Sequence, residues 1–109
     1  MAKLLIARGA NVNASDFEPP LNAAAAAGRP DLVSLLLDSG ADVNGRDDEG
    51  YTALMEAAGS GYREVAERLI AAGIDVNARN GEGLTALHYA RSESQLEIAE
   101  LLVQAGAQE

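Results

Sequence analysis

The chain has 109 residues, a formal net charge of −9 and no cysteine. This length fits one domain, and the lack of thiols excludes disulfide bonds, a cysteine nucleophile and cysteine-based zinc sites. The acidic balance argues against nucleic acid or an anionic membrane as the main partner, because binding to phosphate groups requires clustered lysine and arginine.

The first predicted element is a short helix from Met1 to about Arg8. Its apolar run is only four residues long before Arg8. A run of this length is too short for the hydrophobic region of a signal peptide or for a membrane span. We therefore expect a cytoplasmic protein.

Two prolines mark the start of the next predicted helix. After the polar turn 16–18, Pro19 stands where a capping residue is expected, and Pro20 takes the first helical position, where proline is tolerated. The alanine run 23–27 predicts an inner helix, whose small side chains let neighbouring helices approach closely. The leucine-rich stretch 32–37 predicts a second, core-forming helix.

The central segment shows how turns and helices alternate. Residues 47–51 form a polar turn with a glycine near its end, as a hairpin tip requires. Thr52 can cap a helix over 53–60, and a glycine-bearing break separates it from a second helix over 63–72. One face of that second helix is apolar, and the charged residues Glu64, Glu67 and Arg68 are expected to face away from it.

The same pattern returns every 33 residues. Gly40, Gly73 and Gly106 keep this interval, and Asn44 and Asn77 keep it too. A fixed period of this length indicates one supersecondary unit stacked on copies of itself. Stacked units make extended surfaces, so recognition of another macromolecule is the expected function rather than chemistry.

Three segments, 35–44, 50–54 and 83–90, resemble the ankyrin repeat, whose 33-residue period and threonine-proline-leucine-histidine signature they share in part. The resemblance covers essentially the whole chain as a single domain, residues 1–109. It divides this domain into a half repeat at 1–13 and repeats at 14–44, 45–77 and 78–109. It implies an all-α repeat solenoid, an ankyrin-like stack of helix-turn-helix units with short hairpin-like turns.

Two departures from the repeat are informative. The first full repeat is two residues short, with the gap where Gly50 and Tyr51 stand in the next, and Ser94 stands where other repeats carry glycine. The chain also opens with only the second helix of a repeat. It is either a fragment of a longer array or begins with a degenerate cap, and the exposed leucines of this half repeat would favour weak self-association.

Candidate catalytic and metal-binding residues all have simpler explanations. The resemblance implies that the His88 imidazole hydrogen-bonds groups near the turn, here Thr85. The equivalent positions hold Asn22 and Met55, and no catalytic partner is arranged beside His88. The acidic run 47–49 lacks the alternating spacing of a calcium loop. We predict no enzyme activity, no cofactor and no metal.

The resemblance also implies that the turn tips and the exposed side of each first helix form a concave, partner-binding groove. The positions that map to this groove or beside it are Phe17, Glu18, Arg29, Asp48, Glu49, Tyr51, Glu56, Tyr62, Glu82, Leu84, Tyr89 and Glu93. All four aromatic residues of the chain are among them, and tyrosine is enriched at interface hot spots.

Aromatic anchors within an acidic rim suit a protein partner whose binding segment carries basic and apolar side chains. Two alternatives remain open. The acidic residues could serve solubility alone, or the chain could be a structural spacer or a fragment of a larger ankyrin-repeat protein whose activity lies elsewhere.

Overall fold

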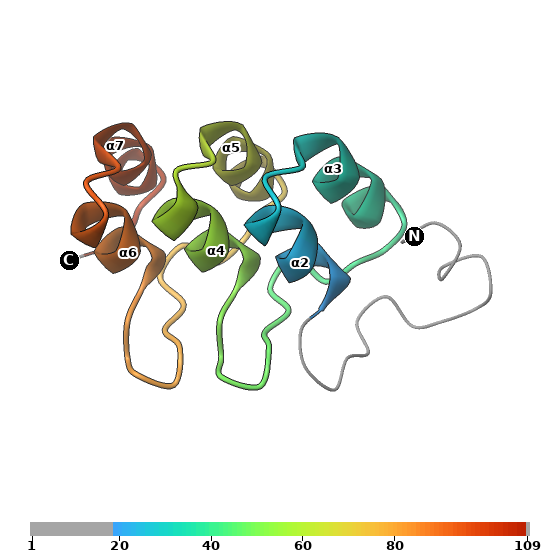
Figure 1. The fold of residues 1–109 in the computed structure, drawn as a ribbon, viewed down its shortest axis with the longest axis horizontal. Coiled ribbons are helices and arrows are strands. Elements are labelled where there is room, and N and C mark those ends of the chain that lie inside the picture. Colours follow the sequence, from blue (N-terminus) through green and yellow to red (C-terminus); the bar gives the residue numbers. More distant parts are fainter. Residues whose placement is uncertain (1–18, 109) are drawn as a thin grey trace.

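The computed structural model describes residues 19–108, and within them the fold is a stack of paired helices (Figure 1). The helices are α2 (Pro20–Ala26), α3 (Pro30–Asp38), α4 (Ala53–Ser60), α5 (Arg63–Ala71), α6 (Ala86–Ser92) and α7 (Leu96–Gln104). The predicted all-α solenoid is confirmed. The predicted first helix, the turn with Phe17 and Glu18, and the half repeat expected to self-associate lie outside the described residues.

The stack has two layers. Helices α2, α4 and α6 form one row, and α3, α5 and α7 form a second, outer row (Figure 1). Each helix contacts its partner in the repeat and the equivalent helix of the next repeat. The loops that join successive repeats extend side by side from the inner row, on the side away from the outer row (Figure 1).

Corresponding helices begin at a constant interval. Pro20, Ala53 and Ala86 open the inner helices 33 residues apart, and the outer helices keep the same spacing. The interval from Pro20 to Ala53 is complete, so the two residues missing from the first full repeat fall before Pro20.

Threonine caps start two of the inner helices, and the cap at Thr52 was predicted. The Thr52 hydroxyl accepts a hydrogen bond from the Met55 amide at 3.3 Å, and Thr85 does the same for His88 at 3.3 Å. Such a bond satisfies one of the amides that a helix leaves free at its start. Helix α2 lacks a side-chain cap and begins instead with Pro20 in its first turn, which needs no amide partner.

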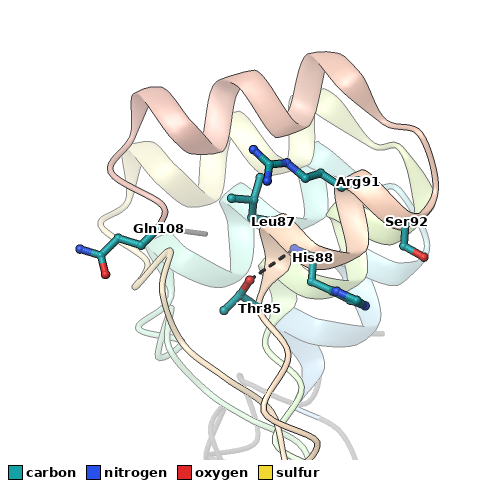
Figure 2. A pocket seen from close by; sticks show the side chains of 6 residues that line it. All are labelled: Thr85, Leu87, His88, Arg91, Ser92 and Gln108. Atoms are coloured by element: carbon teal, nitrogen blue, oxygen red, sulfur yellow. Dashed lines mark hydrogen bonds between the residues drawn. The ribbon is translucent and has the colours of Figure 1, made fainter.

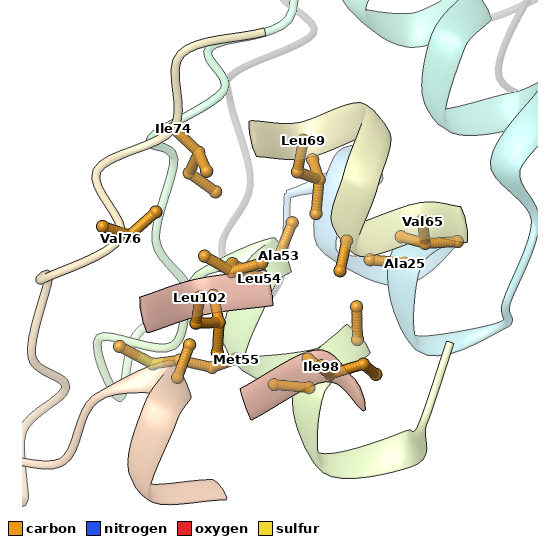
Figure 3. Close-up of a cluster of buried hydrophobic side chains, with 14 of the residues drawn as sticks. Ala25, Ala53, Leu54, Met55, Val65, Leu69, Ile74, Val76, Ile98 and Leu102 are labelled. Carbon is orange, nitrogen blue, oxygen red and sulfur yellow. The ribbon is translucent and has the colours of Figure 1, made fainter. Parts of the chain in front are cut away.

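The apolar core lies between the two layers (Figure 3). Leu54 from α4, Leu69 from α5 and Leu102 from α7 are fully buried. Buried alanines dominate the inner helices, among them Ala57 and Ala58 of α4. Their small side chains allow α4 to pack against both α2 and α6, so that each repeat stabilises its neighbours.

The prediction that Arg68 faces away from the packed face of its helix is wrong. Arg68 is half-buried, and its Nη1 donates to the Pro30 carbonyl at 3.0 Å and to the Ser34 hydroxyl at 2.8 Å. Its Nη2 also pairs with Glu64 at 2.6 Å within α5. Arg68 therefore joins α5 to α3, because a long side chain can run along a neighbouring helix and still reach its polar groups. Helix α5 itself ends at Ala71, one residue before the predicted end.

Ser94 is the one described residue other than glycine with a positive φ, 60°, close to the 70° of Gly28 and the 82° of Gly61. A side chain in this conformation is strained. We expect Ser94→Gly to raise the free energy of unfolding by about 0.5–1 kcal/mol, measured by urea denaturation. Ser92→Gly, at the end of α6, is the control and should lower it. A loss of stability in Ser94→Gly would contradict the assignment.

None of the helices described between residues 19 and 108 is both long and apolar enough to cross a membrane.

Candidate partner-binding face

Two hairpin tips, residues 47–51 and 80–84, are built in the same way. The side-chain oxygen of Asp47 accepts hydrogen bonds from the backbone amides two and four residues further along, both at 2.9 Å. The Asn80 side-chain oxygen does the same at 2.9 and 3.1 Å. Such turns are closed when a short polar side chain accepts hydrogen bonds from the backbone amides of the residues that follow it.

The two tips lie directly against each other. The Gly81 amide donates to the Glu49 carbonyl at 2.9 Å, and Arg46 Nη1 donates to the Arg79 carbonyl at 2.7 Å. Gly50 has a φ of 85°, and a Cβ placed on it would stand 3.0 Å from the Gly81 nitrogen. This close approach requires glycine, because any side chain would meet the backbone of the next tip.

Tyr51 and Tyr89, both predicted as anchors of the groove, form one cluster behind the tips. Their ring centroids are 5.8 Å apart with the planes tilted by 38°, and the Tyr89 hydroxyl donates to the Tyr51 hydroxyl at 3.0 Å. Asn80 Nδ2 donates to the Tyr89 hydroxyl at 2.7 Å. The two tyrosines come from different repeats, so the cluster ties the second repeat to the third.

Asn80 is a residue of this cluster that the sequence analysis missed. It is buried, and it both closes its own tip and positions Tyr89. The signal was present in the 33-residue interval, because Asn80 stands at the position of Asp47. An amide can accept with its oxygen and still donate with its nitrogen, whereas a carboxylate only accepts.

The surroundings of Tyr51 favour its neutral form. The hydrogen bond with Tyr89 raises the pKa of Tyr51 to about 12, and partial desolvation and the negative charges of Tyr89, Glu82 and Glu49 act in the same direction. The hydroxyl proton of Tyr51 is thus bound more tightly in the folded state than in the unfolded chain. Its contribution to stability is complete below the ordinary pKa of 10.0 and is lost as the pH rises toward 12.

We therefore expect an alkaline titration of the folded chain, followed by tyrosinate absorbance, to show one of the three tyrosines ionising near pH 12. This step should disappear in Tyr51→Phe and persist in Tyr62→Phe. Circular dichroism would confirm that the chain is still folded. Ionisation of all three tyrosines together near the ordinary value would contradict the cluster.

The other predicted contact residues within the described range divide into three groups. Asp48, Glu49 and Glu82 are exposed at the tips, with Leu84 half-buried beside them. On the inner row, Glu56 is half-buried on α4 and Glu93 is exposed just after α6.

Arg29 and Tyr62 lie elsewhere. They are in the turns that join α2 to α3 and α4 to α5. Tyr62 rests on the preceding repeat, since a Cβ on Gly28 would stand 2.8 Å from the Tyr62 Cζ. Arg29 is exposed and pairs with Asp31 at 3.5 Å. The structure therefore separates both residues from the tyrosine cluster.

His88 differs from the expected arrangement. The bond between His88 and Thr85 comes from the His88 backbone amide, and the imidazole is exposed and points away from Thr85 (Figure 2). The ring lies edge-on to Tyr89, with centroids 5.4 Å apart and planes at 85°. The imidazole thus contacts its aromatic neighbour in an edge-to-face arrangement.

Comparison with known proteins agrees with this architecture. A family model described as ankyrin repeats in three copies matches residues 1–80 and 21–109. The chain is similar to the E3 ubiquitin-protein ligase hecd-1 of Caenorhabditis elegans, at 44% identity over 57 residues, or 52% of this chain and 2% of that protein. It is also similar to the E3 ubiquitin-protein ligase XBAT33 of Arabidopsis thaliana, at 58% identity over 38 residues, or 35% of this chain and 7% of that protein.

The chain thus spans only a small part of the curated relatives that it matches. The family model, in contrast, reaches from the first residue to the last, over the same 33-residue units that the helices show. This chain belongs to the ankyrin repeat family.

Proposed function

We propose that the chain is a non-catalytic module that binds a protein partner through the concave side of its stack, at the tips of the second and third repeats. Ankyrin repeats generally mediate protein–protein interaction and are generally not catalytic. The observation that carries the choice of face is the Tyr51–Tyr89 cluster, which sets two half-buried aromatic rings beside exposed carboxylates. Aromatic anchors surrounded by polar residues are typical of interface hot spots.

The distribution of charge supports the same face. The ion pairs of Arg29, Arg63 and Arg68 involve the outer helices or the turns before them, as in Arg63 with Glu67 and Glu97. At the tips, Arg46 and Arg79 donate to backbone carbonyls instead. The tip carboxylates therefore attract a basic segment, which speeds encounter more than it deepens affinity.

A second candidate function is that the chain is a spacer or recognition part of a larger ankyrin-repeat protein. The relatives favour this idea, because the chain matches 2% of one ubiquitin ligase and 7% of another. The enzymatic work would then lie in other domains. The limits of the repeats, at 1–13, 14–44, 45–77 and 78–109, likewise remain our proposal for how the domain is divided.

The face can be tested by affinity capture from the source cells with quantitative mass spectrometry. A tip variant, Glu49→Lys with Glu82→Lys, is compared with an outer variant, Asp38→Lys with Glu100→Lys, which changes the net charge equally. All four residues are exposed. We expect a protein that the wild type and the outer variant capture to be lost from the tip variant. Equal retention by both variants, or equal loss, would contradict the assignment.

A further inference from the structure

A small hollow lies between the two hairpin tips. Glu49 and Tyr51 line it from one tip, Gly81 and Glu82 line it from the next, and its volume is about 450 Å³. The tips cannot separate easily, because the Gly81 amide is bonded to the Glu49 carbonyl and the tyrosine hydroxyls are bonded behind them. The hollow is therefore a preformed feature of the stack.

The chemistry of this hollow is that of a cation site for a side chain. Glu49 and Glu82 are exposed, and neither carboxylate takes part in an ion pair within the described part of the chain. Tyr51 adds an aromatic ring, and the negative charges of both carboxylates raise the pKa of its hydroxyl. Rings of this kind attract cations at their face.

Among cations, the guanidinium group fits these walls best. It is planar, it can bond a carboxylate with two parallel N–H groups, and it stacks on aromatic rings. An ammonium group is a compact and strongly hydrated charge without such a plane. Two exposed carboxylates and a tyrosine line the same hollow, so they can together bind the N–H groups of a guanidinium and contact its plane.

We propose that the hollow lined by Glu49, Tyr51, Gly81 and Glu82 receives one arginine side chain of the partner. The proposal rests on the proposed function, since it names the residue that the same face would recognise. It places the arginine at the junction of the second and third repeats, where both tips contribute one carboxylate each.

The proposal is tested by nuclear magnetic resonance on the isotope-labelled chain, with Nα-acetyl-arginine amide as the probe. The citrulline analogue is the neutral control, and the lysine analogue is the competing cation. We expect the arginine probe to cause saturable chemical-shift changes of the backbone amides at 49–51 and 81–82. The lysine probe should bind about threefold more weakly, and the citrulline probe should cause no saturable change. Added salt should weaken the binding.

Variants of the tips make the test specific. The double variant Glu49→Gln with Glu82→Gln should lower the affinity for the arginine probe about fivefold or more, because it removes two exposed charge partners. Asp48→Asn, which removes a tip charge outside the hollow, should change it by less than about twofold. The spectra also show whether each variant is folded.

Three results would overturn the proposal: arginine shifts no larger than those of citrulline, lysine binding as tight as arginine, or equal weakening by Asp48→Asn. Failure here is separate from failure of the proposed function. If tip-dependent capture of a protein persists without arginine binding, the face remains and only the arginine assignment is lost.

Discussion

Replacing Leu54 by alanine is expected to lower the free energy of unfolding by about 2–5 kcal/mol. Leu54 is 0% exposed on α4, the inner helix that contacts both neighbouring repeats. The loss combines the transfer energy of the missing methyl groups with the cavity that they leave. It is a large share of the stability of a small domain, and it should spread to both neighbours, because each repeat of a stack stabilises the next.

Urea denaturation followed by circular dichroism measures this loss. Leu96→Ala is the matched control, since Leu96 is 73% exposed on α7 and its truncation should cost no more than about 0.5 kcal/mol. Similar losses at the two positions would mean that the core does not lie between the two layers.

Gly50→Ala is expected to have the second-largest effect, a loss of about 2–3 kcal/mol. The φ of 85° strains any side chain, and the new Cβ would meet the Gly81 nitrogen at 3.0 Å and the Asn80 Cα at 3.1 Å. These neighbours are backbone atoms, so relief requires the two tips to move apart. Tyrosine ionisation near pH 12 should then shift toward its ordinary range, because the Tyr51–Tyr89 bond spans the same tips.

Gly83→Ala is the control for backbone strain alone. Gly83 has a nearly equal φ of 79°, and a Cβ on it would meet nothing within 4 Å. Its loss of stability should be about 1 kcal/mol, and the difference between the two variants measures the contact between tips. Equal losses in a thermal or urea melt would show that this contact contributes nothing.

The repeat architecture was predictable because its causes are local and recur. The capping threonines Thr52 and Thr85 and the prolines at the start of α2 each act within one helix or turn. The 33-residue interval shows that such features return at equivalent positions. Their recurrence in phase identifies the stack with little ambiguity.

The contacts between repeats were less predictable, because they depend on which side chains reach across. Asn80 positions Tyr89 only because it carries an amide where the previous repeat has a carboxylate. Tyr62 was expected at the break between paired helices, beside the groove, but its packing on Gly28 of the preceding repeat was not predicted. Arg68 has the charge of a solvent-facing residue and yet lies along α3. Amphipathic periodicity assigns a residue to a face of its own helix and does not show what the next repeat places there.

The most direct test of the central claim, that the partner binds at the tips of the second and third repeats, is site-specific photo-crosslinking. A photoreactive amino acid is placed at Glu82 on a tip or at Glu100 on α7, and both positions are exposed. We predict that crosslinks to a partner form from position 82 and are absent from position 100. Crosslinks that form equally from both positions, or only from position 100, would contradict it.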